Sequence, residues 1–250
     1  MRTIRLAGLA GILMLVAAQA NASPLTVNAT DSVYGAANSG SGATDPVSVL
    51  LNAATTSLTF TGVSGSITSG CASTEGCITI NHNSGDNYNN PDGVGAASNF
   101  TGTGYGSLSG ITTSGAGALV GVFVAGTPSG AAPTTLDFSS GSLGTSFTSL
   151  SPLLDQVFFI GDGLTGPGDG TGSTQQFNVP SGATTLYLGL ADGCSYTGSP
   201  SCYGDNLGSY SVTVNQAPVT QGVPEPASIA TLAVGMLGLA GVARTRRNRA

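Results

Sequence analysis

Oxygen-bearing side chains gather in one loop in the C-terminal part of the chain. The loop carries Asp192 at its start and Asp205 and Asn206 at its end, with Cys194 and Cys202 between them. Carboxylate and amide oxygens are calcium ligands, and calcium takes about six to eight of them, so positions would remain for backbone carbonyls, water or ligand hydroxyls. These residue types predict a calcium site on which Asp192, Asp205 and Asn206 converge.

The residues on either side of this loop predict two strands that present it. Between residues 184 and 190 leucine alternates with other residue types, and between 209 and 215 tyrosine or valine alternates with serine or threonine. A period of two is typical of a half-buried strand. Residues 177–215 therefore predict a β-hairpin closed by the loop that holds the oxygen ligands.

The charge balance leaves these carboxylates without cationic side chains. The chain has six basic residues, all of them arginines in the terminal segments, whereas its 12 acidic residues lie between positions 23 and 243. Phosphate groups need Lys or Arg to neutralise them, so the sequence excludes nucleic-acid binding and disfavours phosphoryl transfer. Clustered carboxylates must then be solvated, protonated or bound to a metal ion, and an exported chain favours calcium.

The sequence offers few residues for catalysis, and we predict that the protein is not an enzyme. The sole histidine, His82, lies in a polar segment without a nucleophile partner, and no G-x-S-x-G motif occurs. Asp192 and Asp205 have the residue types of a glycosidase pair, but aspartates beside glycine-rich turns are more typical of structural or metal sites. Two other acidic segments, 86–93 and 161–170, lack an EF-hand register and predict turns.

The four cysteines predict disulfides, because the chain has the features of a secreted protein. Three pairings are possible. The simplest joins Cys71 to Cys77 and Cys194 to Cys202, since each pair closes a short loop. Zinc is a poor alternative because neither pair has C-x2-C spacing and His82 is the one histidine available.

Both termini have the composition of targeting segments. Residues 1–22 combine a basic start with an apolar core and end in Ala20-Asn21-Ala22, which predicts a signal peptide cleaved by signal peptidase after Ala22. At the other end, Pro224-Glu225-Pro226 precedes an apolar run over residues 227–243 and an arginine-rich tail. The run is at the short limit for a membrane span, and the arginines would hold the tail in the cytoplasm.

The C-terminal segment 223–250 resembles the PEP-CTERM sorting signal of Gram-negative bacteria. The order of PEP motif, short apolar helix and basic tail carries the resemblance. It implies a transient inner-membrane tether, cleavage near the motif by an exosortase, and release to the cell surface or extracellular matrix. An ordinary single-span anchor is the alternative.

The region between these segments predicts one all-β domain, a β-sandwich or jelly roll, over residues 23–215, followed by a linker at 216–222. Short apolar runs separated by glycine-rich turns favour this class. The runs at 118–124 and around 157–160 are continuous, which is typical of strands buried on both faces. The first and last strands share a pattern, and we expect them to lie near each other, which would bring the mature termini together. The predicted strands are residues 25–29, 47–51, 58–62, 77–81, 118–124, 134–138, 156–160, 174–179, 184–190 and 209–215.

The loop and its flanking strands resemble the C-terminal half of the bacterial galactophilic (PA-I-type) lectins. The segment YGDNLGSYSV at 203–212, preceded by VPSGATTL at 179–186 and by Asp192, carries the resemblance. Those lectins are calcium-dependent β-sandwiches in which sugar hydroxyls complete the metal coordination. The resemblance implies that Asp205 and Asn206 are adjacent calcium ligands. It also implies that Asp192 contacts metal and sugar, and that Cys202 supplies a backbone carbonyl.

A second segment, NPDG at residues 90–93, resembles the sugar-contacting H-P-D-Q-G loop of the same lectins. The resemblance implies that Asn90 and Asp92 form the rim of a carbohydrate pocket with Asp192, Asp205 and Asn206. Here Asn90 replaces the histidine and the glutamine is missing, so the sugar itself stays open.

Two functions from different classes follow from these patterns. The first is a secreted, calcium-dependent carbohydrate-binding protein, with exopolysaccharide as a candidate ligand. The alternative is a structural surface or biofilm-matrix protein without a specific ligand, in which Asp192 and Asp205 are turn residues. Ice binding is a third possibility, but the sequence has no regular Thr-x-Thr ladder to favour it.

Overall fold

The computed structural model of the chain describes residues 22–37, 43–68, 89–93 and 99–218. Within these ranges no helix is both long enough and apolar enough to cross a membrane. Several sequence predictions lie outside the described residues: the signal peptide except for Ala22, the predicted strand at 77–81, the Cys71–Cys77 pair, and the sorting signal at 223–250 with Pro224, Glu225 and Pro226.

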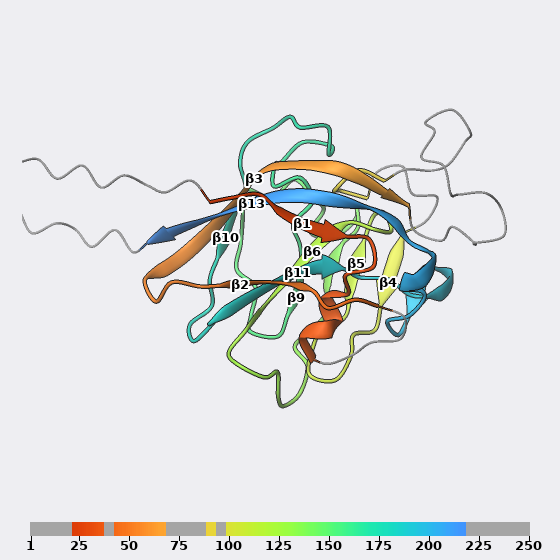
Figure 1. Ribbon diagram of the computed structural model, residues 1–250, viewed down its shortest axis with the longest axis horizontal. Coiled ribbons are helices and arrows are strands. Elements are labelled where there is room, and N and C mark those ends of the chain that lie inside the picture. Colours follow the sequence, from red (N-terminus) through yellow and green to blue (C-terminus); the bar gives the residue numbers. More distant parts are fainter. Residues whose placement is uncertain (1–21, 38–42, 69–88, 94–98, 219–250) are drawn as a thin grey trace, which may run out of the picture.

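The first sheet contains the longest strands and brings the two ends of the described chain together. It is 5-stranded, in the order β1-β13-β3-β10-β8. The bounds in that order are Leu25–Asn28, Leu207–Pro218, Thr55–Thr68, Gln176–Asn178 and Ser149–Leu150. β1 runs antiparallel to β13, with Leu25 opposite Val212 and Asn28 opposite Ser209. The prediction that the first and last strands lie near each other is confirmed, since they pair side by side (Figure 1).

The second sheet is 4-stranded, in the order β2-β11-β6-β9. Its strands are Val47–Leu50, Thr185–Leu190, Leu119–Val124 and Val157–Phe159. Every residue of β6 is buried, which is what its continuous apolar run predicts for a central strand. A third sheet, also 4-stranded, contacts β9 through β5 and β7. Its order is β12-β4-β5-β7, with bounds Thr197–Gly198, Phe100–Gly102, Ile111–Thr113 and Leu136–Phe138.

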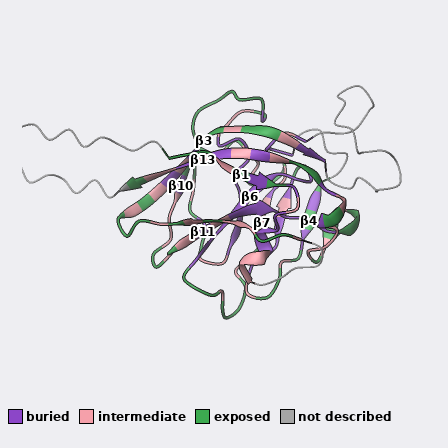
Figure 2. Ribbon diagram, in the orientation of Figure 1, coloured by how far each residue is buried: buried purple, intermediate pink, exposed green. Residues whose placement is uncertain are grey.

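Aromatic side chains join the first two sheets across the core. Phe177 of β10 meets the ring of Phe60 of β3 edge-on at 5.0 Å between centroids, and meets Phe158 of the opposite sheet at 5.6 Å. Phe158 in turn stacks on Phe123 of β6 at 5.1 Å. Buried residues gather between the two sheets (Figure 2). The prediction of an all-β, sandwich-like fold is therefore confirmed.

The hairpin predicted for residues 177–215 is wrong. β11 pairs with β2 and β6 in the second sheet, whereas β13 pairs with β1 and β3 in the first. Each strand has a partner on both edges, so neither can pair with the other. Residues 191–206 instead cross from one sheet to the other and close one end of the sandwich (Figure 1).

The strand boundaries differ from the predicted ones in several places, and most at β3, which runs over Thr55–Thr68 where residues 58–62 were predicted. Four short strands, β4, β5, β8 and β12, were not predicted, because two or three residues are too few to show a period. The last strand also runs further than expected, so residues 216–218 of the predicted linker belong to β13. The Gln216 side chain anchors this extension, since it accepts a hydrogen bond from the Asn52 N–H at 2.8 Å and donates one to the Leu50 carbonyl at 2.9 Å.

Candidate functional site

The crossing loop brings Asp192 and Asn206 together from the ends of two different sheets. Asp192 follows β11 closely, and Asn206 directly precedes β13. The Asn206 side-chain nitrogen donates to Oδ2 of Asp192 at 2.8 Å and to the carbonyl of Ala29, next to β1, at 3.0 Å. Since both partners are acceptors, the amide is oriented with its nitrogen toward them. Asn206 thus ties the ends of β1 and β11 to the start of β13.

Asp192 is held in a buried and largely saturated environment. It is 4 % exposed, and its Oδ1 accepts a hydrogen bond from the Gly193 N–H at 2.7 Å. Its own backbone N–H donates to the hydroxyl of Tyr203 at 3.1 Å, and that hydroxyl donates to the Leu190 carbonyl at 3.3 Å. Burial raises the pKa of Asp192 to about 6, although the hydrogen bonds from Asn206 and Gly193 favour its charged form.

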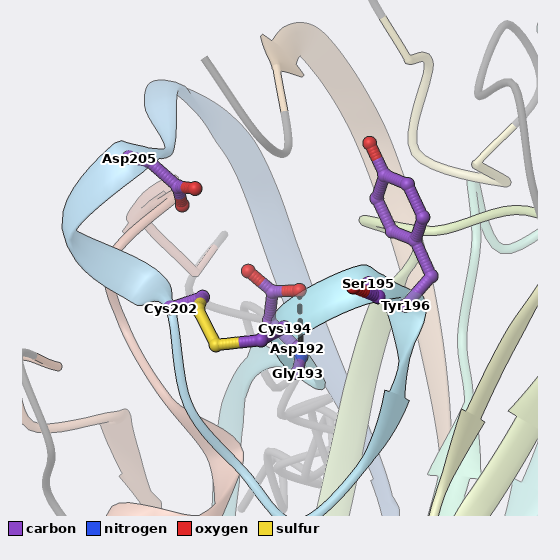
Figure 3. A pocket seen from close by; sticks show the side chains of 7 residues that line it. All are labelled: Asp192, Gly193, Cys194, Ser195, Tyr196, Cys202 and Asp205. Carbon is purple, nitrogen blue, oxygen red and sulfur yellow. Dashed lines mark hydrogen bonds between the residues drawn. A yellow bond between two sulfur atoms is a disulfide. The ribbon is translucent and has the colours of Figure 1, made fainter. Parts of the chain in front are cut away.

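A pocket of about 250 Å³ opens in front of this carboxylate. Figure 3 shows the carboxylates of Asp192 and Asp205 directed toward the same space, with the disulfide below them. The lining residues are Asp192, Gly193, Cys194, Ser195, Tyr196, Cys202 and Asp205. Oδ1 of Asp205 is buried and has no hydrogen-bond partner among the described residues, and burial raises the pKa of this carboxyl. The pocket therefore holds two carboxylates, one of which has an unsatisfied oxygen.

The cystine that closes the loop confirms one of the two predicted disulfides. Cys194 and Cys202 are bonded, with 5.3 Å between their Cα atoms. The bridge forms one wall of the pocket, and it joins the segment that follows Asp192 to the segment that precedes Asp205 (Figure 3). Its effect is to fix the separation of the two carboxylates.

Replacing Cys194 and Cys202 together by serine is expected to lower the free energy of unfolding by about 2–3 kcal/mol, because the open chain gains conformational freedom in the unfolded state. Urea unfolding followed by circular dichroism measures this loss. Ser199→Ala, an exposed change in the same loop, is the control and is expected to be neutral within about 0.5 kcal/mol. A double serine variant as stable as the control would contradict the prediction.

The oxygen atoms of the pocket supply only part of the ligand set that calcium needs. The described residues contain no group of three or more His, Cys, Asp or Glu arranged to hold a metal ion. The pocket instead offers the carboxylates of Asp192 and Asp205, which are hard oxygen ligands of the type calcium prefers. The other oxygens must come from backbone carbonyls, water or a ligand. Asn206 contacts Asp192 through nitrogen, so its role in this arrangement is to orient that carboxylate.

The structure places Asn90 and Asp92 apart from the residues that line this pocket. Asn90 donates to the carbonyl of Gly168 at 2.5 Å, and Oδ1 of Asp92 accepts from the Asp162 N–H at 2.7 Å. Asp92 is 3 % exposed. Both side chains therefore hold the glycine-rich loop at 161–170, and the Asp92 carboxyl is not presented to solvent.

Four residues of the site are not predicted from the sequence: Gly193, Ser195, Tyr196 and Tyr203. Ser195 and Tyr196 line the pocket, and Tyr203 is buried beneath it with its hydroxyl bonded to the backbone on both sides of Ala191. The sequence does mark Tyr196 as a candidate site residue, because it is the lone aromatic residue inside a cystine loop of small side chains. Tyr203 sits beside Cys202, and its burial follows only from the crossing of the loop between sheets.

Comparisons with known proteins add no relative to this description. No protein-family model, curated protein or solved structure matches the chain.

Proposed function

We propose that this protein is an exported, lectin-like protein that binds carbohydrate through a calcium ion held at the Asp192–Asp205 pocket. The observation that carries the proposal is the convergence of two carboxylates on one pocket, with Oδ1 of Asp205 left without a partner among the described residues. A buried, unsatisfied carboxylate oxygen is costly, and a bound cation would remove that cost.

The composition supports an external cation as the missing partner. Between residues 23 and 243 the chain has neither Lys nor Arg, so no Lys or Arg of the domain can pair with these carboxylates. A divalent ion at the pocket would supply the charge, and it would favour the ionised forms of both groups.

The size of the pocket suits a small polar ligand. Its volume of about 250 Å³ lies below the roughly 300–1,000 Å³ of sites for drug-sized molecules. Solvent-exposed residues of the loop form part of its lining. A calcium ion bound by two carboxylates keeps coordination positions that a pair of sugar hydroxyls can fill. The proposed activity is binding, and no catalytic step is assigned to it.

The alternative role is structural, as a component of a surface or biofilm matrix. It is favoured by one observation, that both oxygens of Asp192 already accept hydrogen bonds within the chain. In that role the cystine and Asn206 stabilise the end of the sandwich and no ligand is needed.

For localisation, we propose export through the signal peptide at 1–22 and sorting through the PEP-CTERM-like segment at 223–250, with an exosortase as the processing partner. The support is the order of motifs in the sequence. The destination would be the surface or extracellular matrix of a Gram-negative cell, where calcium and polysaccharide are both available.

Calcium is expected to raise the melting temperature of the chelator-treated protein, because a ligand that binds only the folded state stabilises it by about 2.7 kcal/mol at one hundred times its Kd. Differential scanning calorimetry with and without calcium measures the effect, and a glycan array measures carbohydrate binding under the same conditions. Asp205→Asn and Asp192→Asn are expected to lose both responses.

Asp45→Asn is the matched control, since Asp45 is exposed and does not line the pocket. It is expected to respond to calcium as the unmodified protein does. If calcium changes neither the melting temperature nor glycan binding of the unmodified protein, the structural role replaces the proposed one.

A further inference from the structure

The pocket contains an unusual stretch of backbone. Ser195, Tyr196 and Cys202 have φ values of 60°, 62° and 64°, and the one other non-glycine residue with positive φ in the described chain is Asp155. The left-handed region costs a non-glycine residue of order 1–3 kcal/mol, so such residues persist only where their surroundings hold them. Three of these positions line one pocket, and two of them are consecutive.

Contacts within the loop hold this backbone, and β12, which follows Tyr196 directly, adds a pairing with β4. The cystine clamps both ends of the segment, and the Tyr196 N–H donates to the Gly193 carbonyl at 2.8 Å. The hydroxyl of Ser201 accepts from the Cys194 N–H at 3.1 Å, and the Ser201 N–H donates to the Asp192 carbonyl at 3.2 Å. This framework fixes the direction in which the Tyr196 side chain leaves the chain.

That direction brings an aromatic ring to the side of the pocket away from Asp205. In Figure 3 the carboxylate of Asp192 lies between Asp205 and the ring of Tyr196. Tyr196 is partly buried, packs against the hydrophobic core and also lines the pocket, so the fold supports its side chain where it borders the site. An aromatic ring fixed in this way presents a rigid apolar face at little further entropy cost.

The pocket thus has an oxygen side and an aromatic side. A pyranose has the matching polarity, since its hydroxyls lie at the edge of the ring while one face consists mainly of C–H groups. We propose that Tyr196 is the stacking platform of this site and selects hexopyranosides that can lay a C–H face on its ring while two adjacent hydroxyls reach the Asp192 and Asp205 side. This inference rests on the proposed function and names the class of sugar that the site takes.

The test uses the full protein, calcium alone as the first probe, and a panel of methyl hexopyranosides as the second. Calorimetric titration gives the Kd for each. Tyr196→Leu is expected to keep the Kd for calcium within about twofold and to weaken the best glycoside about tenfold or more, because one tenfold change corresponds to roughly 1.4 kcal/mol. Tyr196→Phe keeps the ring and is expected to bind the glycoside nearly as well as the unmodified protein.

Tyr187→Leu, in β11 and outside the pocket lining, controls for the loss of a tyrosine elsewhere in the fold. The unmodified protein gives a second readout that does not depend on folding of a variant. Proton NMR of the bound glycoside is expected to show upfield ring-current shifts for the C–H protons of one sugar face and no comparable shift for the other face.

The outcomes separate this inference from the function on which it rests. If the unmodified protein binds neither calcium nor any glycoside, both are overturned. If it binds both while Tyr196→Leu binds the glycoside equally well, or while no ring-current shift is seen, the stacking role alone is overturned. Loss of calcium affinity in Tyr196→Leu would show that Tyr196 shapes the metal site, and would also overturn the stacking role.

Discussion

Replacing Phe177 by alanine is expected to lower the free energy of unfolding by about 3–5 kcal/mol, the range for removing a buried aromatic ring. Phe177 is fully buried and joins the two sheets through its contacts with Phe60 and Phe158. It also meets Phe147 edge-on at 5.8 Å. The truncation therefore leaves a cavity at the centre of the sandwich, where the long paired strands of both sheets restrict collapse. Urea unfolding followed by tyrosine fluorescence measures the loss.

Leu50→Ala is the matched control, because Leu50 is 79 % exposed and its truncation removes no core contact. It is expected to change stability by less than about 0.5 kcal/mol. Phe177→Leu serves if the alanine variant does not fold, and its loss is expected to be smaller but clearly above that of the control. Equal stabilities for Phe177→Leu and Leu50→Ala would contradict the account of the core.

The second large effect concerns Asp92 and the dependence of stability on pH. Burial raises the pKa of this carboxyl from 3.8 to about 7; the charges of Asp162 and Asp169 act in the same direction, and the hydrogen bond from the Asp162 N–H opposes them. Its Oδ2 has no partner among the described residues. Glycines at 161 and 168 surround it, and a Cβ at Gly168 would lie 2.7 Å from the Cβ of Asp92. The site therefore stabilises a neutral acid.

The sign follows from the raised pKa. Below about pH 4 Asp92 is protonated in both the folded and the unfolded state, and its contribution to stability is fully present. As the pH rises from about 4 to about 7 the unfolded state loses the proton while the folded state keeps it, so the free energy of unfolding falls. A pKa difference of this size corresponds to about 4 kcal/mol in total, and the decline levels off above about pH 7.

Asp92→Asn removes the titrating group and is expected to flatten this part of the curve. The measurement is urea unfolding at several pH values between about 4 and 8, with a chelator present so that metal binding does not contribute. As the pH rises, the stability of Asp92→Asn relative to that of the unmodified protein should increase. The exposed Asp45→Asn should keep the original slope. Parallel curves for Asp92→Asn and the unmodified protein would rule out a titrating Asp92.

The sequence predicts the strands better than it predicts their partners. Period-two and continuous apolar patterns locate β6, β9 and β11 because burial on one or both faces leaves a trace in residue type. Pairing leaves a weaker trace, although the shared pattern of β1 and β13 does predict that these two strands lie near each other. The residues around 186–190 and 209–215 have the pattern of a hairpin, yet β2, β6, β1 and β3 occupy their edges. Each strand's choice of neighbour depends on long-range packing that a local pattern does not encode.

The candidate site was likewise predicted in part: the residue types were visible in the sequence, but their contacts were not. Residue type identified Asp192, Asp205 and the Cys194–Cys202 pair, because carboxylates and short cystine loops are visible in the sequence. It did not reveal that Asn206 uses its nitrogen to hold Asp192, since an amide can face a partner with either end. It also did not separate Asp92 from the pocket, because burial at 3 % exposure results from the glycine-rich loop folding over it.

The course of β13 determines by which side the protein can be attached to a support without covering the pocket. β13 starts at Leu207, beside the pocket, and ends at Pro218, roughly 35 Å away at about 3.3 Å per residue. β1 begins at Leu25, opposite Val212 near the middle of β13, and runs from there toward the pocket end. A tag, fusion partner or sensor chip joined through the C-terminal end of β13 would hold the sandwich by the side opposite the pocket. The Asp192–Asp205 pocket would then face the solution.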